Sequence, residues 1–238
     1  MKFDEVSEKL AHVPYMTANR AAKMRELVIE TDASSILELG FYQGKSTCYL
    51  AAMLEDRGKG HITTIDLDSA KKLSPNIHEN LAALGIEHRV TTVYAKRSYT
   101  WELARMIKRG DRFDLCYLDG GHTWDNTGFG FVLVDLILRP GGIIVLDDMS
   151  WSIAKSIAAT DAFARRYARY DDDEKEEKVI KLVWDTVVPR LGYEREYARR
   201  LNWGIARKPA HPKADTRTLG DSGFGLFRRG NSGASKQP

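Results

Sequence analysis

Cysteine is scarce in this sequence, with only two among 238 residues. Cys48 falls in a predicted helix, and Cys116 lies inside an apolar run that is typical of a buried strand. These positions favour two buried free thiols over a disulfide or a cysteine metal site. Free thiols persist in reducing compartments, so we expect a cytoplasmic location.

Long hydrophobic runs are also missing. No stretch approaches the roughly 20 apolar residues that cross a bilayer. Residues 1–10 carry alternating charges where a signal peptide would be apolar, so no membrane association is expected. The apolar content of 43% can fill the core of one substantial α/β domain, and the chain is too short for a second full domain.

The main body of the chain has no excess of positive charge. Residues 1–206 hold 29 Lys and Arg against 31 Asp and Glu, whereas residues 207–238 hold seven against two. Nucleic acid is therefore a disfavoured partner, because the main body offers no basic face. We expect a helical segment over 1–32, a domain over 33–208, and a disordered basic tail over 209–238, which has few large apolar residues.

The sequence does contain a strand, a glycine turn and a helix in succession. Residues 35–39 form a short apolar run, Gly40 and Gly44 follow it, and residues 46–54 resume a helical pattern. In open α/β sheets, ligands bind beyond the carboxyl ends of strands, where glycine admits a close approach and a helix start offers free N–H groups. The turn is thus a candidate ligand site, although an ordinary strand-to-helix turn has the same composition.

Spacing separates the ligands that such a turn binds. A phosphate-binding P-loop that ends at Gly44 would need a glycine where Leu39 stands. A dinucleotide fingerprint that begins at Gly40 would need a glycine where Tyr42 stands. The pattern that remains is Glu38-x-Gly40-x-x-x-Gly44, with an acid at the end of the strand.

A second acid ends the next predicted strand. Residues 61–66 are rich in β-branched residues and finish at Asp66. A carboxylate at this place in a nucleotide-binding type of fold accepts hydrogen bonds from ribose hydroxyls, so Asp66 is the candidate for that role. Asp68 is the alternative, because a shift of two residues keeps the same face of the strand.

Three further acids follow two buried strands. Asp119 comes directly after the apolar strand 113–118, and Asp147 and Asp148 come directly after the apolar strand 143–146. Parallel neighbours present their carboxyl ends on one rim, so these side chains are expected to converge. Their oxygen ligands would suit a hard cation such as Mg²⁺, with Mn²⁺ or Ca²⁺ as alternatives. A network satisfied by backbone amides and water is the other explanation.

The motifs together resemble a known group of enzymes. The pattern around Gly40 and Gly44 is similar to the first motif of the class I S-adenosylmethionine-dependent methyltransferases. Segment 117–122 (Tyr-Leu-Asp-Gly-Gly-His) and segment 139–148 (Arg-Pro-Gly-Gly-Ile-Ile-Val-Leu-Asp-Asp) resemble the small-molecule O-methyltransferases. That group includes macrocin O-methyltransferase and, more distantly, catechol O-methyltransferase. The resemblance covers residues 33–150.

The resemblance implies a fold, a cofactor and a set of site residues. The fold is α/β, with a doubly wound, mostly parallel seven-stranded sheet of the Rossmann-like methyltransferase type and a C-terminal antiparallel hairpin over 193–206. The implied S-adenosyl-L-methionine site comprises Glu38, Gly40, Gly44, Asp66, Ser98 and Asp119. The implied ligands of Mg²⁺, or of another divalent cation, are Asp119, Asp147 and Asp148. For Ser98, a plain turn residue is the alternative.

The resemblance also implies a reaction. The methyl group would pass to a hydroxyl of a small-molecule acceptor while the metal lowers the pKa of that hydroxyl. The catechol enzymes place a lysine, the general base, three residues after the first metal ligand. Here His122 stands in that place, and an ordinary pKa of about 6.5 suits it for catalysis beside Asp119. A metal ligand or a structural loop histidine is the alternative for His122.

Two other functions stay open on the sequence alone. One is a protein of the same fold that binds S-adenosylmethionine without methyl transfer, and the other is different metal-dependent chemistry on the same scaffold. Trp124 and Trp151 flank the acids and would either stack on an acceptor or serve in packing. The sequence is compatible with a homo-oligomer.

Overall fold

A seven-stranded sheet forms the centre of the protein, which is described here by a computed structural model for residues 1–158 and 161–210. The strand order is β3-β2-β1-β4-β5-β7-β6. The strands are β1 (Ser35–Leu39), β2 (His61–Leu67), β3 (Val90–Ala95), β4 (Phe113–Leu118), β5 (Leu138–Leu146), β6 (Glu194–Ala198) and β7 (Trp203–Arg207). β1 to β5 are parallel, and β7 pairs antiparallel with β5 and β6. The predicted fold class is confirmed.

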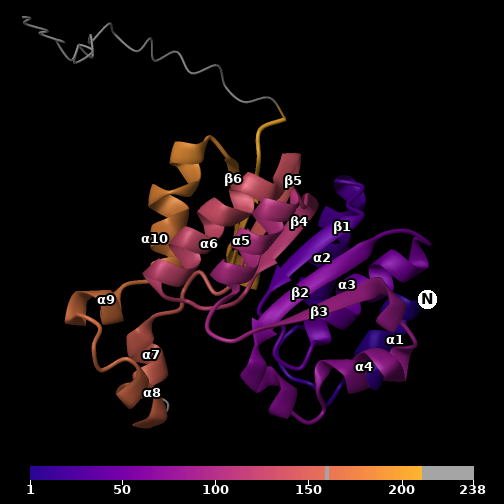
Figure 1. Ribbon diagram of the computed structural model, residues 1–238, viewed down its shortest axis with the longest axis horizontal. Coiled ribbons are helices and arrows are strands. Elements are labelled where there is room, and N and C mark those ends of the chain that lie inside the picture. Colours follow the sequence, from indigo (N-terminus) through magenta and orange to yellow (C-terminus); the bar gives the residue numbers. More distant parts are fainter. Residues whose placement is uncertain (159–160, 211–238) are drawn as a thin grey trace, which may run out of the picture.

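Helices cover both faces of the sheet (Figure 1). One face carries α1 (Lys2–Lys9), α2 (Ala18–Glu30), α3 (Lys45–Asp56) and α4 (Ile77–Leu84). The other face carries α5 (Tyr99–Arg109), α6 (Trp124–Ile137) and α10 (Val179–Thr186). Four short 3-10 helices complete the connections, namely η1 (Asp68–Lys72), η2 (Glu87–Arg89), η3 (Val188–Leu191) and η4 (Arg199–Leu201).

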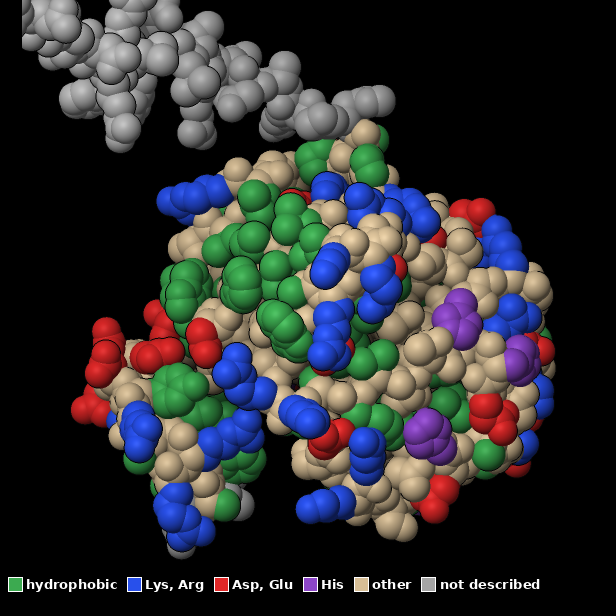
Figure 2. Space-filling view, in the orientation of Figure 1, with side chains coloured by type: hydrophobic (Ala, Val, Ile, Leu, Met, Phe, Trp, Pro, Cys, Tyr) green, Lys and Arg blue, Asp and Glu red, His purple; other side chains and the backbone are tan. Residues whose placement is uncertain are grey.

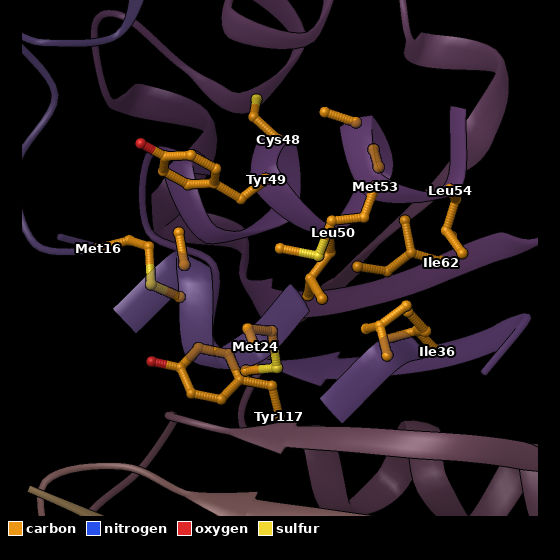
Figure 3. Close-up of a cluster of buried hydrophobic side chains, with 14 of the residues drawn as sticks. Met16, Met24, Ile36, Cys48, Tyr49, Leu50, Met53, Leu54, Ile62 and Tyr117 are labelled. Atoms are coloured by element: carbon orange, nitrogen blue, oxygen red, sulfur yellow. The ribbon is translucent and has the colours of Figure 1, made fainter. Parts of the chain in front are cut away.

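The strands are buried on both sides because successive side chains point to opposite faces. In β1, Ile36 packs under α2 and α3, whereas Leu37 faces the α5 and α6 side. Figure 3 shows the first of these cores, where Met24, Ile36 and Leu50 meet between helices and sheet. The two thiols that the sequence predicted to be free are confirmed as free and buried.

The order of the strands changes direction at β1. The chain adds β2 and β3 on one side of β1 and then returns to add β4 and β5 on the other. Leu39 at the end of β1 pairs with Leu118 at the end of β4, so the residues that follow both strands lie side by side. Open α/β sheets bind their ligands at this kind of switch point.

Short helices follow β5, namely α7 (Ile153–Ile157), α8 (Asp161–Arg166) and α9 (Asp172–Glu176). These short helices form a lobe beside the sheet in Figure 1, and the same lobe stands apart from the main body in the space-filling view of Figure 2.

Of the predicted tail over 209–238, all but the first two residues lie outside the described part of the structure. Among the helices within 1–158 and 161–210, none has the length and apolar character needed to cross a membrane.

Candidate active site

The glycine turn after β1 is held in a backbone conformation that other residues rarely adopt. Gly40 has φ +92° and Gly44, which begins α3, has φ +84°. A Cβ atom on Gly40 would lie 2.7 Å from the backbone oxygen of Asp119, and one on Gly44 would lie 2.5 Å from the Ile77 side chain. Both positions therefore need glycine for conformation and for space.

Glu38 supports this turn from beneath. Its carboxylate is fully buried and accepts hydrogen bonds from the hydroxyls of Thr47 (2.5 Å) and Thr64 (2.6 Å), while Oε1 has no partner. Burial raises the pKa of Glu38 to about 7. Glu38 lines neither of the two cavities at this rim, and its hydrogen bonds join the end of β1 to α3 and β2.

Asp66 lies on the other side of the turn, at the end of β2. Its Oδ2 accepts hydrogen bonds from the backbone N–H groups of Phe41 (2.9 Å) and Tyr42 (2.7 Å). It lines both cavities. Asp68, the alternative predicted from sequence, is the first residue of η1 and accepts a hydrogen bond from the Lys71 ammonium at 2.8 Å. It lines neither of the two cavities. Of the two acids, only Asp66 is placed to contact a ligand.

Two adjoining cavities follow the carboxyl edge of the sheet. The first has a volume of about 220 Å³ and the second about 100 Å³. Residues common to both walls are Gly40, Asp66, Gly120 and Gly121. An elongated ligand that spans both cavities would thus pass directly over the glycine turn.

The first cavity is also lined by the loop between α1 and α2. Tyr15 of this loop is 72% exposed, and its ring packs against the ring of Tyr42 in the glycine turn. The two ring centroids lie 5.4 Å apart. The nearby Lys45 ammonium donates to the backbone oxygen of Val13 at 2.7 Å, which fastens the loop to the start of α3. The N-terminal segment therefore packs on the sheet and forms one wall of the site.

The second cavity contains the predicted Ser98. Its hydroxyl donates to Oδ1 of Asn126 at 2.8 Å, and it caps α5 by accepting from the N–H of Thr100 at 3.3 Å. Tyr99 and Asn126 also line this cavity, and the Tyr99 hydroxyl donates to the Asn126 backbone oxygen at 2.9 Å. Asn126 was not predicted from sequence, because no motif includes it.

Two of the acids predicted to converge after β4 and β5, Asp119 and Asp148, lie close to His122 at this rim. One ligand atom from each of Asp119, His122 and Asp148 lies within 4.8 Å of the others. His122 Nε2 lies 3.7 Å from Asp119 and 3.8 Å from Asp148, and this buried nitrogen has no hydrogen-bond partner. Although burial opposes a charged imidazole, the surrounding carboxylates raise the pKa of His122 overall.

Asp119 and Asp147 are also affected by burial. Burial raises the pKa of Asp119 to about 7 and is the main cause of a raised pKa at Asp147. Asp147 is 1% exposed and lies outside that cluster. Its Oδ2 accepts from Arg20 at 3.0 Å and from the Tyr117 hydroxyl, which also lies 3.3 Å from Oδ2 of Asp119. Arg20 lies 127 residues away in the chain and had no role in the predictions from sequence.

Aromatic rings line the approach to His122. Trp151 packs on the His122 ring with a centroid distance of 5.1 Å, and Tyr167 of the short-helix lobe lies 6.4 Å from Trp151. Trp124, at the start of α6, is 42% exposed. The packing places Trp151 at the acid cluster, while it does not bring Trp124 into either cavity wall.

Comparison with known proteins agrees with this geometry. Residues 37–149 match the model of a family described as a methyltransferase domain. No curated protein matches the chain by sequence.

Solved structures with the same fold come from several organisms. One is a Staphylococcus aureus protein assigned as a caffeoyl-CoA O-methyltransferase, with 16% identity, coverage of 87% of this chain and 92% of that chain, and a TM-score of 0.64. A Podospora anserina methyltransferase bound to S-adenosylhomocysteine (SAH) has 14% identity, 87% coverage of each chain and a TM-score of 0.62. A Bacillus cereus O-methyltransferase in complex with SAH has 17% identity, coverage of 87% and 89%, and a TM-score of 0.57.

The matched domain spans the glycine turn, Asp66, Asp119 and the paired acids. The likeness to the solved structures extends over most of the chain and concerns the fold. Residues 37–149 are therefore similar to a methyltransferase domain, and the chain has the fold of the solved methyltransferase structures.

Proposed function

We propose that this protein transfers the methyl group of S-adenosylmethionine to a hydroxyl oxygen of a small molecule, with the help of a divalent cation. The observation that carries the proposal is the position of Asp119. It lines the first cavity beside Gly40 and also belongs to the His122 and Asp148 cluster. One ligand in the cavities and a second at the cluster would therefore meet at this residue.

The cavity walls support a cofactor along the glycine turn. The methionine part would lie over Gly40 and the start of α3, where Lys45 and Ser46 line the first cavity and the first helical turn leaves N–H groups without helical partners. Asp66 would accept hydrogen bonds from the ribose hydroxyls, and the adenine would lie against Ser98 in the second cavity. The structures from Podospora anserina and Bacillus cereus contain SAH, which supports this choice of ligand.

The donor set of the cluster fits a divalent cation. It combines two carboxylates with an imidazole nitrogen that is buried and has no partner. Like charges this close are unfavourable unless a positive charge lies between them. A bound divalent cation would supply a Lewis acid that lowers the pKa of the acceptor hydroxyl and orients its oxygen.

The reaction needs alignment more than activation of the methyl donor. The acceptor oxygen forms a bond to the methyl carbon as the carbon–sulfur bond breaks, and both electrons of that bond stay on sulfur to give SAH. Tyr15 and Tyr42 in the wall of the first cavity, and Trp151 beside His122, would hold the acceptor in line. The hydroxyl proton must also leave. His122 was the sequence-based proton acceptor, a role open to it only while no cation occupies Nε2.

The direct test is a methyl-transfer assay with a panel of phenols, catechols and sugars. SAH release and the methylated product are measured together by mass spectrometry, with Mg²⁺ or Mn²⁺ and after chelation. We expect an O-methyl ether from at least one hydroxylated acceptor and a large loss in Asp119→Asn but not in the control Asp111→Asn. SAH binding without transfer to any acceptor would instead favour a binding protein of the same fold.

A further inference from the structure

We propose that the divalent cation is held by Asp119, His122 and Asp148, and that Arg20 keeps Asp147 out of the ligand set. Because one ligand is an imidazole, the site would prefer a first-row transition ion such as Mn²⁺ or Co²⁺ over Mg²⁺. The inference rests on the proposed function for its cation. It replaces the role of His122 as proton acceptor and the role of Asp147 as a ligand.

Asp147 already has partners on both carboxylate oxygens. Oδ2 accepts from Nη1 of Arg20 at 3.0 Å and from the hydroxyl of Tyr117. Oδ1 accepts from the backbone N–H of Asp148 at 2.6 Å. A cation that binds Oδ2 of Asp147 would have to displace the charge-assisted hydrogen bond from Arg20, which is stronger than a neutral one.

Arg20 is held in place by contacts other than Asp147. Its Nη2 donates to the backbone oxygen of Leu201 at 3.0 Å, and its guanidinium lies 5.7 Å from the centre of the Trp203 ring. An arginine side chain does not lose its charge in proteins, so this competitor for Asp147 is permanent. Nη2 of Arg20 also forms an ion pair with Oδ1 of Asp148 at 3.9 Å, a distance too long for a hydrogen bond, so Arg20 holds Asp147 more directly than Asp148.

His122 has the opposite environment. Its Nε2 is buried, has no hydrogen-bond partner, and lies 3.7 Å and 3.8 Å from the carboxylates of Asp119 and Asp148. Contact with Trp151 at 5.1 Å limits rotation of the ring. Ligand atoms at roughly 2.1 Å from one ion lie about 3 to 4 Å from each other, so these three need only small adjustments.

The donor set decides which ions would bind. Mg²⁺ prefers oxygen ligands and keeps several waters, whereas imidazole suits transition ions. The set of three carboxylate ligands expected from the sequence would need Asp147, which already accepts a hydrogen bond from Arg20. The chain thus offers one nitrogen and two carboxylates to the ion, with the remaining positions open to the acceptor and water.

The direct experiment detects the nitrogen ligand without any acceptor. Electron spin echo envelope modulation is recorded on full-length protein loaded with Mn²⁺. We expect modulation from one directly bound ¹⁴N in the wild type and its loss in His122→Gln, with the Mn²⁺ affinity of that variant reduced at least tenfold. Bound Mn²⁺ without nitrogen modulation in the wild type would overturn the assignment, as would the absence of Mn²⁺ binding.

Calorimetry with Mn²⁺ and Mg²⁺ tests the part played by Arg20. We expect Asp148→Asn to lose at least tenfold in Mn²⁺ affinity and Asp147→Asn to change by less than about threefold. Arg20→Gln should bind Mg²⁺ more tightly than the wild type, because Asp147 becomes free to act as an oxygen ligand. Equal losses in the two Asn variants, with wild-type circular dichroism and melting temperature, would contradict the proposed ligand set.

The outcomes also separate this inference from the proposed function. Methyl transfer to an acceptor by a protein that binds no Mn²⁺ would keep the methyl transfer of the proposed function and reject the cation site. Nitrogen-bound Mn²⁺ in a protein that neither binds SAH nor methylates any acceptor would support the ligand set and reject the proposed function.

Discussion

Gly40 and Asp119 are in close backbone contact where β1 and β4 end. A Cβ atom added to Gly40 would lie only 2.7 Å from the Asp119 backbone oxygen. This contact joins the turn that would hold the cofactor to the acid that would hold the cation. Gly40→Ala should therefore lower the free energy of unfolding by about 3 kcal/mol, from the left-handed backbone and the clash together. It should also weaken SAH binding. Urea unfolding and calorimetry measure the two effects.

Gly58 provides the matched control. It also has positive φ (+67°), but a Cβ atom there would meet nothing within 4 Å. Gly58→Ala should cost only the backbone strain, about 1 kcal/mol, and leave SAH binding unchanged. Equal destabilisation by the two substitutions would show that the approach of Gly40 to Asp119 is not tight.

Glu38 should make stability depend on pH. Its folded-state pKa of about 7 lies above the ordinary 4.5, so folding takes up a proton in this window and stability falls as pH rises through it. The difference between these two pKa values corresponds to about 3 kcal/mol in the free energy of unfolding. Glu38→Gln keeps an acceptor for Thr47 and Thr64 but has no proton to lose. The unfolding free energy of Glu38→Gln, measured relative to that of the wild type, should therefore rise by about 3 kcal/mol between pH 4.5 and pH 8.

The measurement is urea unfolding at a series of pH values, with Glu8→Gln as an exposed control. A gap between Glu38→Gln and wild type that stays constant across the series would mean that Glu38 keeps an ordinary pKa in the folded protein. In that case another partner, such as a water on the free Oε1, must stabilise its charged form.

Removal of metal should separate methyl transfer from cofactor binding. Once an acceptor is known, dialysis against a chelator should reduce transfer at least tenfold, and Mn²⁺ should restore it at a lower concentration than Mg²⁺. SAH affinity should change by less than about threefold, because Asp66 and the glycine turn lie outside the cation cluster. Full activity in protein shown by elemental analysis to be metal-free would rule out a metal-assisted reaction.

Much of the fold and part of the site were predictable from local pattern. Short apolar runs that end in glycine or an acid indicated strands with their functional residues at one edge, and a parallel sheet brings such ends together. Glycine spacing alone was enough to exclude a P-loop after β1. For these reasons Gly40, Asp66 and Asp119 could be expected at a common rim before any coordinates were known.

The parts that sequence could not supply depend on distant contacts. Arg20 is an ordinary helix residue next to the buried Ala21, and nothing in α2 indicates that it reaches Asp147. Adjacent residues point in different directions, so Asp147 and Asp148 could not be assigned separate partners from their spacing. The chain after Trp151 packs through ring contacts such as that between Trp151 and Tyr167, and the spacing of apolar residues in the sequence does not predict such contacts.

The measurement that tests the central claim most directly is calorimetric titration of SAH into the wild type, Asp66→Ala and Asp68→Ala. Binding with a micromolar Kd by the wild type, a loss of at least tenfold in Asp66→Ala and a change below about threefold in Asp68→Ala are the predicted results. Absence of binding by the wild type, or equal effects of the two substitutions, would contradict a cofactor site built on the glycine turn and Asp66.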